Sequence, residues 1–577
     1  MQTLLCYGIV LNYLWILNAN ENKEKVSELS EKLAIQPTLA KVLIRRGIND
    51  IETANKFFNP SLDDLLDPFL MDDMDKAVNR ILKGIENKEQ FWIHGDYDVD
   101  GTSSVSMITL FLRESGAIVD YFIPDRFHDG FGINDRSIQN AIKNNAKILI
   151  TVDVGITSFE MLDLAASHNI DTIICDHHEP AEILPKAFAI LDPLKHNSNY
   201  SFKSLSACGV VFKLIQAIST KLGNPDMALK YLDFVALATA ADMVPLIDEN
   251  RIMLHYGLHK INTNPRTGFK SLIYCSGINQ NDITTSNIIY SIAPLINAAG
   301  RLGHANRSVE LMTNPNEIKC FQIAQQLEDE NRKRRAFDQK LYDAALPIAE
   351  KDYNSGKHSL VIYGEGWHTG VVGIVASRLV DRFHSPVVLL SNIDNYARGS
   401  ARCPHNFDMY AALKKCENLL IEFGGHKHAA GITLELDKID EFKNTFEDIA
   451  KEALSKDMLL PNILIDAEIN FNDLSPAFFK IINKFSPFGF ANPKPIFLTK
   501  GVQINNGIKQ LSPNKIRFRA IQGNFVIDAV AYNLNSKLDI LRKNNFFSVA
   551  YNLETHSLNG RHIPQINIKD IQIEERD

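Results

Sequence analysis

Cysteine is scarce in the sequence, and the few cysteines are scattered. There are seven among 577 residues, and no two of them form a C-x-x-C pair. A zinc ribbon needs such pairs and a disulfide-stapled domain needs a denser framework, so neither kind of protein is expected. Reduced thiols are typical of a cytoplasmic protein, and we predict that location.

A long apolar run is also missing. Residues 1–17 read MQTLLCYGIVLNYLWIL, but no Lys or Arg precedes the apolar residues and no A-x-A-like cleavage site follows them. A secretory signal is therefore not expected, and about seventeen residues are short for a transmembrane helix. We expect residues 1–13 to be an extended start or a loosely held segment, and we expect no membrane partner.

The chain has no excess of positive charge. It contains 61 Lys and Arg against 69 Asp and Glu, a net charge of −8. That balance argues against a general affinity for nucleic acid, so any DNA binding has to come from local basic grooves or from bound metals. The length allows about three or four domains at roughly 100–200 residues each.

The stretch Phe91–Gly101, FWIHGDYDVDG, concentrates polar side chains behind a short apolar run. Within seven residues it offers four metal-binding side chains, namely His94, Asp96, Asp98 and Asp100. Such a cluster repels itself in water, and carboxylates with a neutral imidazole are ligands that Mg²⁺ and Mn²⁺ accept. A calcium-type turn or an acidic surface loop is the alternative. An EF-hand is not expected, because the glycine and the closing glutamate fall at the wrong positions.

Two later apolar runs end in the same way. The run ILITVDVG carries Asp153 near its end, and DTIICDHHE carries Asp176, His177 and His178. In open α/β sheets, ligands bind beyond the carboxyl ends of the parallel strands. A lone DHH would be a weak signal, but three strand ends that bring acids and histidines to one edge of a sheet predict a metal site.

The three motifs HGDYDVDG, TVDVG and DHH resemble the signatures of the DHH phosphoesterase family. Further stretches are similar to its RecJ branch, the single-stranded-DNA-specific exonucleases, and follow one another in the expected order: IPDRFHDGFGIN (123–134), SACGVVFKL (206–214), ADMVPLIDENR (241–251), NAAGRLGHA (297–305), GWHTGVVGIVASRL (366–379), GSAR (399–402) and GGHKHAAG (424–431). The departures are small: Val154 stands where a cysteine is common, and Cys403 stands where a serine is common.

The resemblance implies two divalent ions, Mn²⁺ or Mg²⁺, which activate water and stabilise the attacking and leaving oxygens of a phosphodiester. One ion is then held by His94, Asp98 and Asp153. The other is held by a second set that shares the bridging aspartate: Asp100, Asp153, His177 and Asp242.

Three further residues of these motifs complete the expected catalytic site. Asp96 is an additional acid of the first motif, and whether it belongs to the ligand set stays open. Asp176 is expected to orient a ligating histidine, because such histidines usually donate their other ring nitrogen to a carboxylate or carbonyl. His178 is expected to face the substrate phosphate or the leaving group.

The resemblance also implies the substrate. It indicates a 5′-to-3′ exonuclease that acts on single-stranded DNA, releases 5′-mononucleotides and works in DNA repair and recombination. Side chains that donate to phosphate oxygens are expected to bind the DNA: Arg126, Arg301, Ser400, Arg402 and His426. A helicase and a single-strand-binding protein are further candidate partners.

The order of apolar runs predicts an α/β protein. From about residue 75 to 245, helix-like and strand-like segments alternate, which favours a doubly wound and mostly parallel sheet. One long helix is expected from Glu317 to Lys351. We divide the chain into an N-terminal helical segment (1–70), a DHH catalytic domain (71–250), a helical connector (251–352), a smaller α/β DHH-associated domain (353–455) and an OB-fold domain (456–577).

The C-terminal segment has strand-like alternation, as in IRFRAIQ and FVIDAVAYNL, which predicts a small β-barrel. Residues 501–570 contain nine Lys or Arg and four Asp or Glu, a local net charge of +5. OB-folds bind single strands by stacking bases on aromatic rings above a basic groove. Six aromatic residues are interleaved with these charges, and we expect most of them to fill the barrel core: Phe518, Phe525, Tyr532, Phe546, Phe547 and Tyr551.

Two other functions are compatible with a DHH core. One is a phosphodiesterase that acts on short oligonucleotides or cyclic dinucleotides, but such substrates do not need a basic, aromatic C-terminal module. The other is a non-catalytic DNA-binding scaffold, which the complete set of acids and histidines disfavours.

Overall fold

The apolar runs before the three acidic motifs form neighbouring strands of one parallel sheet. In the computed structural model, all pairings in this sheet are parallel and the strand order is β3-β2-β4-β5-β6. The strands are β2 (Gln90–Gly95), β3 (Ile118–Phe122), β4 (Ala146–Val152), β5 (Asp171–Cys175) and β6 (Ala189–Leu191). The chain moves from β2 to one side and then returns to the other, so the strand order reverses between β2 and β4. That switch point is where ligands of doubly wound sheets bind.

The structure describes residues 13–17, 22–126, 128–130, 132–279, 282–302, 305–393, 395–534, 537, 541, 546–558 and 561–574. These residues fall into two compact units. The sheet unit contains the described residues from Lys56 to Arg334 and from Phe485 to Pro493. The second unit contains those up to Asn55, from Arg335 to Lys484 and from Lys494 onwards.

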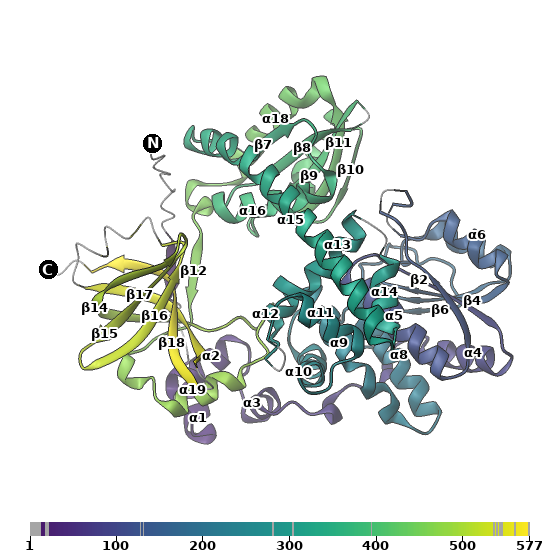
Figure 1. Cartoon of the computed structure of the whole chain (residues 1–577), viewed down its shortest axis with the longest axis horizontal. Coiled ribbons are helices and arrows are strands. Elements are labelled where there is room, and N and C mark those ends of the chain that lie inside the picture. Colours follow the sequence, from purple (N-terminus) through teal and green to yellow (C-terminus); the bar gives the residue numbers. More distant parts are fainter. Residues whose placement is uncertain are drawn as a thin grey trace. The chain divides into compact units, whose positions relative to one another are not determined.

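Helices cover both faces of the parallel sheet, as the alternation along the sequence predicts (Figure 1). On one face, Leu149 packs with α6 (Asp135–Lys143) and α7 (Phe159–Ser167). On the other face, Ile148 and Ile150 lie in the larger core with three helices, α4 (Met74–Glu86), α5 (Val99–Glu114) and α8 (Ala207–Lys221). Successive residues of β4 are thus buried on opposite faces, which explains the unbroken apolar run of this strand.

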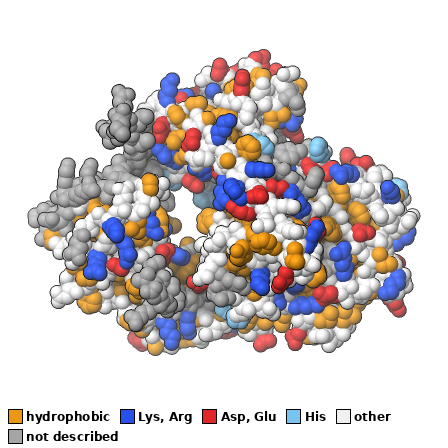
Figure 2. Space-filling model, in the orientation of Figure 1, with side chains coloured by type: hydrophobic (Ala, Val, Ile, Leu, Met, Phe, Trp, Pro, Cys, Tyr) orange, Lys and Arg blue, Asp and Glu red, His pale blue; other side chains and the backbone are white. Residues whose placement is uncertain are grey.

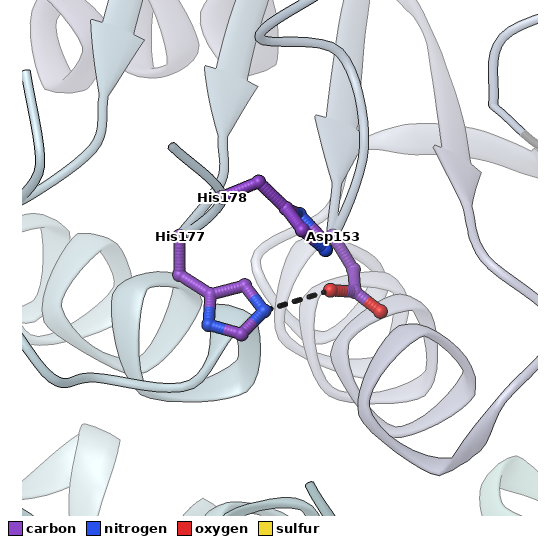
Figure 3. Close-up of side chains that lie close together, drawn as sticks. All are labelled: Asp153, His177 and His178. Atoms are coloured by element: carbon purple, nitrogen blue, oxygen red, sulfur yellow. Dashed lines mark ion pairs between the residues drawn. The ribbon is translucent and has the colours of Figure 1, made fainter. Parts of the chain in front are cut away.

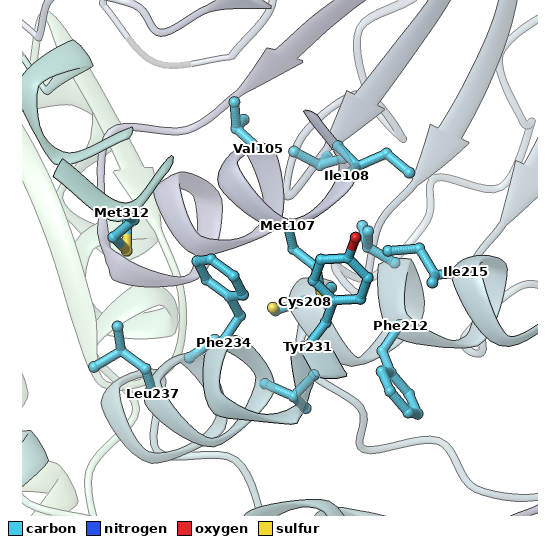
Figure 4. Close-up of a cluster of buried hydrophobic side chains, with 14 of the residues drawn as sticks. Val105, Met107, Ile108, Cys208, Phe212, Ile215, Tyr231, Phe234, Leu237 and Met312 are labelled. Atoms are coloured by element: carbon cyan, nitrogen blue, oxygen red, sulfur yellow. The ribbon is translucent and has the colours of Figure 1, made fainter. Parts of the chain in front are cut away.

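The larger core continues away from the sheet into a layer of helices. Figure 4 shows Met107 and Ile108 of α5, Phe212 of α8 and Phe234 of α9 (Leu232–Ala241) directed into one cluster. Each such side chain contributes roughly 1.5–3 kcal/mol when fully buried. Further helices extend this layer: α10 (Asp248–Thr263), α11 (Thr267–Cys275), α12 (Thr285–Asn287), the π-helical turn η4 (Ile288–Ile292), α13 (Ala293–Leu302) and α14 (Asn306–Thr313).

The predicted long helix is α15 (Glu317–Asn354), whose residues from Arg335 onwards belong to the second unit. There, Leu341 and Ala345 pack with α16 (Thr369–Phe383) on one face of a five-stranded sheet. The strand order is β10-β11-β9-β8-β7, and only β7 and β8 pair in parallel. The elements are β7 (Leu360–Gly364), β8 (Val387–Ile393), β9 (Tyr396–Arg402), β10 (Glu422–Gly425), β11 (Ala429–Glu435), α17 (Met409–Lys415) and α18 (Ile439–Ala453).

The C-terminal strands close into a barrel, which confirms the predicted OB-fold. Five strands pair in the cyclic order β14-β15-β16-β18-β17, because β14 pairs with both β15 and β17. A five-stranded Greek-key barrel is the architecture of OB-folds. The strands are β14 (Ile496–Ser512), β15 (Lys515–Gln522), β16 (Phe525–Tyr532), β17 (Phe547–Leu558) and β18 (Arg561–Ile573), with the short β13 (Ala467–Glu468) beside β14 and α19 (Pro476–Lys484) before it.

The aromatic residues of the barrel divide between the core and the surface. Phe518, Phe547 and Tyr551 are buried, whereas Phe525 and Tyr532 are 50% and 47% exposed. Three of the six aromatic residues are therefore in the barrel core, fewer than the majority that we expected. Two aromatic rings of β16 remain on the surface.

The N-terminal segment belongs to the barrel unit. The strand β1 (Leu14–Leu17) pairs in parallel with β12 (Asn462–Ile465), and three helices follow: α1 (Lys23–Leu33), α2 (Pro37–Arg45) and α3 (Ile51–Phe58), the last of which runs into the sheet unit. Most of the expected loose start, residues 1–12, lies outside the described residues. Within the part of the chain that the structure describes, no helix is both long and apolar enough to span a membrane.

Charges of both signs are mixed over the visible surface. On the face shown in Figure 2, the coloured part carries blue Lys and Arg side chains interspersed with red Asp and Glu side chains.

Candidate metal centre

The first acidic motif curls tightly between β2 and α5. Asp98 is the N-cap of α5, and its Oδ1 accepts a hydrogen bond from Gly101 N at 3.0 Å. A methyl group on Gly101 would lie 2.5 Å from the carbonyl oxygen of Asp96, so a larger residue would force this loop apart. The glycine and the cap together turn Asp96, Asp98 and Asp100 back toward the end of the sheet.

Asp100 is anchored by the start of another helix. Its two carboxylate oxygens accept hydrogen bonds from Ala207 N and Cys208 N, both at 2.8 Å, in the first turn of α8. A helix N-terminus stabilises negative charge. The stretch SACGVVFKL therefore helps to orient an acid of the first motif, although the two lie more than a hundred residues apart.

Asp153 follows β4 in a backbone conformation that is rare for a residue with a side chain. Its φ is +63°, and its N–H donates to the carbonyl of Cys175 at 3.0 Å, which ties the end of β4 to the end of β5. Such local strain is held only when the surroundings enforce it, and it is concentrated at functional sites. The carboxylate is almost fully buried, with an exposed fraction of 4%.

Asp176 bonds the ring of His178 and not that of the predicted ligand His177, which it contacts only through the backbone N–H. Its Oδ1 accepts hydrogen bonds from His177 N at 2.8 Å, His178 N at 3.2 Å and His178 Nδ1 at 2.7 Å, and its Oδ2 accepts from Ile156 N at 3.0 Å. Burial tends to raise the pKa of Asp176, but these hydrogen bonds and the His178 charge hold it below its ordinary value. Asp176 therefore stays ionised as a fixed acceptor.

His177 presents one ring nitrogen to three acids. Its Nδ1 lies 3.2 Å from the carbonyl oxygen of Leu205, which assigns the proton to Nδ1 and leaves Nε2 with a free lone pair. Nε2 lies 3.3 Å from Asp153 Oδ1, 3.8 Å from Asp100 Oδ2 and 3.9 Å from Asp242 Oδ2. Figure 3 shows His177 turned toward Asp153, with the ion pair drawn as a dashed line. A carbonyl behind a histidine in this way is typical of metal ligands.

The structure brings the predicted ligands into three overlapping groups whose candidate ligand atoms lie within 4.8 Å of one another. They are Asp100 with His177 and Asp242, Asp96 with Asp98 and Asp153, and Asp153 with His177 and His178. Asp153 and His177 each occur in two groups, so adjacent sites would share ligands. Asp96 occurs in one group, beside Asp98 and Asp153.

The electrostatics of these acids fit bound cations. Burial, followed by the charges of Asp100, Asp98, Asp96 and Asp242, raises the pKa of Asp153 well above its usual value. Burial also raises the pKa values of Asp96 and Asp242 to about 8. The Oδ1 atom of Asp96 is buried without a hydrogen-bond partner. Acids this close are stable as anions only with a compensating positive charge, which divalent cations provide.

His94 lies beside this cluster but in none of the three groups found among the described residues. It is fully buried, its Nδ1 lies 2.7 Å from Ser137 Oγ, and its Nε2 lies 3.3 Å from the carbonyl of Gly132. Burial lowers its pKa to about 4, so the ring is neutral. A neutral imidazole suits a metal, but ligation through Nε2 would replace the Gly132 contact, and its role as a ligand stays a prediction.

His178 has a more open position than its neighbour. Its side chain is 39% exposed, against 14% for His177. Burial lowers its pKa, but the hydrogen bond to Asp176 and the acids Asp242 and Asp100 outweigh this effect and raise the pKa to about 9. The ring is therefore held by Asp176 on one nitrogen and is partly accessible, as expected of a group that meets a substrate phosphate.

The expected phosphate contacts divide between the two units. In the sheet unit, Arg126 lies in the turn after β3, and Arg301 lies in the last turn of α13. In the second unit, Arg402 Nη1 donates to Ser400 Oγ at 2.7 Å. His426 lies in the exposed loop between β10 and β11, and its N–H donates to the carbonyl of Ala429, the residue paired with Arg402.

Several contributors to the site were not recognised from the sequence. A methyl group on Gly373, in the second turn of α16, would lie 2.8 Å from Arg402 Nη2 and 3.2 Å from Ser400 Oγ, so this helix faces both side chains. The carbonyl of Leu205 fixes the tautomer of His177. A backbone carbonyl cannot be recognised from the type of its residue. Gly373, however, lies within GWHTGVVGIVASRL, and a glycine there could have indicated that other groups approach the helix backbone closely.

Comparison with known proteins places this geometry in a family context. The family model "DHH family, N-terminal domain" matches residues 90–239, the DHHA1 domain matches residues 356–452, and the RecJ OB domain matches residues 465–570. The single-stranded-DNA-specific exonuclease RecJ of Bacillus subtilis is 33% identical over 559 residues, which cover 96% of this chain and 70% of that protein.

A second relative and a solved structure agree with these matches. The single-stranded-DNA-specific exonuclease RecJ of Dickeya dadantii is 30% identical over 554 residues, which cover 92% of this chain and 95% of that protein. The crystal structure of RecJ in complex with Mn²⁺ from Thermus thermophilus superposes with a TM-score of 0.84 at 24% identity, covering 97% of this chain and 80% of that one. The similarity of fold thus extends over nearly the whole length of the chain.

Proposed function

The chain belongs to the RecJ family of single-stranded-DNA-specific exonucleases, and on this premise we propose that it hydrolyses single-stranded DNA from an end with two bound Mn²⁺ or Mg²⁺ ions. The observation that carries the proposal is the overlap of three ligand groups through Asp153 and His177, at the ends of adjacent parallel strands. Shared ligands of this kind suit the closely spaced pair of ions found in nucleases.

The groups of candidate ligand atoms in the structure support a division of the ligands between the two ions. One ion would be held by Asp96, Asp98 and Asp153, and the other by Asp100, Asp153, His177 and Asp242. When bound, such ions offset the repulsion between an attacking oxygen and an anionic phosphodiester and stabilise the attacking and leaving oxygens. His94 is the remaining predicted ligand, and it would bind the ion that Asp98 and Asp153 hold.

The remaining residues of the motif orient the substrate. Asp176 accepts a hydrogen bond from His178 Nδ1 at 2.7 Å, which fixes the ring, and we propose that His178 donates through Nε2 to an oxygen of the substrate phosphate. A hydrogen bond from an ionised donor to a phosphate is stronger than a neutral one. Asp176 also fixes the backbone of His177 and thereby the direction of its Nε2.

Residues of both units would position the DNA strand by binding its phosphates. Arg126 and Arg301 would hold the backbone next to the metal loop, since a guanidinium donates to two phosphate oxygens at once. Ser400, Arg402 and His426 would bind the terminal phosphate, beside the start of α16. From the family resemblance, the bound end is the 5′ end, the product is a 5′-mononucleotide, and the biological setting is DNA repair and recombination.

The barrel would add affinity for the strand. Lys515, Arg517 and Arg519 alternate along β15 with buried residues, and Lys515 Nζ lies 5.1 Å from the ring centroid of Tyr532 on β16. OB-folds bind oligonucleotides on this face of the barrel.

We also propose a cytoplasmic setting, with a helicase and a single-strand-binding protein as partners. The six described cysteines are all free, which agrees with a reducing compartment.

The test is an oligonucleotide labelled at its 5′ or its 3′ end, offered single-stranded or annealed as a blunt duplex, with Mn²⁺ or Mg²⁺. We expect immediate release of a labelled mononucleotide from the 5′ end only, and an intact blunt duplex. Endonucleolytic ladders or equal attack on the duplex would contradict an end-dependent, single-strand-specific enzyme. Preferential hydrolysis of a cyclic dinucleotide in a parallel reaction would favour the small-substrate phosphodiesterase instead.

A further inference from the structure

Tyr97 lies between two acids of the metal loop and is partly buried. Its ring faces the guanidinium of Arg126, whose Cζ lies 5.6 Å from the ring centroid. A cation over the face of an aromatic ring is attracted by the ring's quadrupole. The tyrosine thus contacts one of the two arginines that we expect to bind phosphate beside the metal centre.

The same residue packs against the helix that carries the other arginine. A methyl group on Gly300 would lie 3.0 Å from the carbonyl oxygen of Tyr97 and 3.1 Å from its ring atom Cδ2. Such contacts are closer than an ordinary side chain accepts without a shift of its neighbours. The last turn of α13 therefore approaches the ring closely because residue 300 is a glycine, and Arg301 is the next residue along that turn.

The Tyr97 hydroxyl is influenced by charges of both signs. Burial raises its pKa and the charges of Asp96 and Asp98 add to this rise, whereas the positive charges of Arg126 and Arg301 oppose it. The two arginines come from segments far apart in the sequence, one from the turn after β3 and one from α13. Tyr97 contacts both of these segments, and it lies within the loop that carries Asp96 and Asp98.

We propose that Tyr97 is a positioning residue of this exonuclease. Its ring holds Arg126 and the Arg301 end of α13 at a fixed place beside the acidic loop. Both arginines can then bind the DNA phosphate next to the phosphate of the scissile bond. The inference rests on the proposed function and adds to it a determinant of how the strand is seated. An aromatic ring suits this role because it is rigid and has only two side-chain torsions. The ring, rather than the hydroxyl, does the positioning.

Two substitutions of Tyr97 separate the ring from the hydroxyl. Tyr97→Leu removes the ring, and Tyr97→Phe keeps the ring and removes only the hydroxyl. Tyr274→Leu is a matched control, because Tyr274 is a 73% exposed tyrosine of the same unit, on α11. Each full-length variant is assayed with Mn²⁺ on a single-stranded oligonucleotide and on bis(p-nitrophenyl) phosphate, a small diester that has no neighbouring phosphate.

For Tyr97→Leu, we expect KM for DNA to rise about tenfold while kcat falls less than about threefold, as when an interaction that binds the substrate is lost. Tyr97→Phe should leave KM within about twofold of the wild-type value. In an Arg126→Ala background, Tyr97→Leu should raise KM little further, because the effects of substitutions at interacting residues are not additive.

Three results would overturn the inference while leaving the proposed function intact: wild-type kinetics in Tyr97→Leu, a Tyr97→Phe variant as impaired as Tyr97→Leu, or an equal loss of kcat on DNA and on the small diester. The last of these would mean that the metal loop itself had collapsed. If the unmodified chain leaves single-stranded DNA intact, the proposed function fails, and the inference fails with it.

Discussion

Trp15 and Asp570, which are 555 residues apart in the sequence, are joined by a hydrogen bond in which the indole Nε1–H donates to Asp570 Oδ2 at 2.9 Å. The other carboxylate oxygen accepts from Lys537 Nζ at 2.6 Å. Asp570 is fully buried on β18, so both of its partners satisfy a charge that water does not reach. A side-chain hydrogen bond therefore joins the N-terminal strand β1 to the C-terminal barrel.

This contact predicts that Trp15→Phe destabilises the second unit, which contains the barrel. The substitution keeps an aromatic ring but removes a donor from a buried carboxylate, which typically costs about 1–3 kcal/mol. Urea unfolding of the full-length protein, followed by the change in fluorescence, would measure the loss. Leu14→Ala is the control, because Leu14 is a 51% exposed residue of the same strand. Equal midpoints for Trp15→Phe and wild type would show that the hydrogen bond contributes nothing.

The raised pKa values of the acidic cluster predict an unusual pH dependence for the metal-free protein. The pKa values of Asp96 and Asp242 are raised to about 8, so the folded state binds more protons than the unfolded state from pH ~4 to ~8. Stability in EDTA should therefore fall as pH rises through this interval. Melting temperatures measured from pH 5 to 8.5 with EDTA, and again with Mn²⁺, would test this, because the bound ions should remove most of the decline.

Asp153→Asn gives a sharper test of the same cluster. Removing the most central charge should make the melting temperature in EDTA at pH 8 equal to or higher than that of wild type, while Mn²⁺ should no longer raise it. Activity should fall by about three orders of magnitude or more, which corresponds to about 4 kcal/mol of transition-state stabilisation. Asp163→Asn, on the exposed side of α7, should change neither quantity. Near-normal turnover of Asp153→Asn would remove the basis for the metal assignment.

The sequence predicted those parts of the site in which residue type and periodicity carry the signal. Asp153 and Asp176 each follow an apolar run, and the rule that parallel strands present their carboxyl ends at one edge is enough to bring them together. The barrel was predictable in the same way, because Lys515, Arg517 and Arg519 alternate with apolar residues on β15.

Other parts depend on backbone groups and on packing between distant segments, which leave no such pattern. The carbonyl of Leu205 behind His177, and the first turn of α8 around Asp100, are visible only once α8 is folded against the sheet. His94 shows the reverse case. Its position at a strand end suggests a ligand, yet both of its ring nitrogens have other partners, Ser137 and Gly132.

The outer face of β15 predicts a measurable electrostatic contribution to DNA binding. If Lys515 and Arg519 each contact one phosphate, the double variant Lys515→Gln and Arg519→Gln should reduce the slope of log K against log salt by about 1.4, since each contact to a single strand contributes about 0.7. Fluorescence anisotropy with a long labelled single strand, from about 50 to 200 mM salt, measures this slope. Neutralising Lys23 and Lys25, exposed residues of α1 in the same unit, controls for net charge. Unchanged slopes would mean that these cations belong only to the barrel surface.

Arg251 fastens the segment Phe485–Pro493 to the sheet unit. Its guanidinium is only 3% exposed and donates to the carbonyls of Phe57, Phe485 and Ser486 at 2.8–3.2 Å, and it lies 3.9 Å from the ring centroid of Phe57. The fastened segment in turn holds the chain that follows Asp242, since Leu246 N donates to the carbonyl of Phe490 at 2.9 Å. Residues of the C-terminal half of the chain therefore stabilise the segment that follows Asp242, a proposed metal ligand.

Arg251→Met should consequently weaken both stability and metal binding. Methionine fills much of the space but offers no donors, so several buried carbonyls lose their partners, at about 1–3 kcal/mol for each group that stays unsatisfied. We expect a clearly lower melting temperature in EDTA, together with a severalfold higher Mn²⁺ concentration for half-maximal exonuclease activity, because Asp242 is less well placed. Arg251→Lys, which retains the charge and some donors, should lie between Met and wild type. Arg136→Met is the matched control, since Arg136 is 63% exposed on α6. A destabilised Arg251→Met protein with an unchanged Mn²⁺ requirement would show that the fastening supports the fold without reaching Asp242.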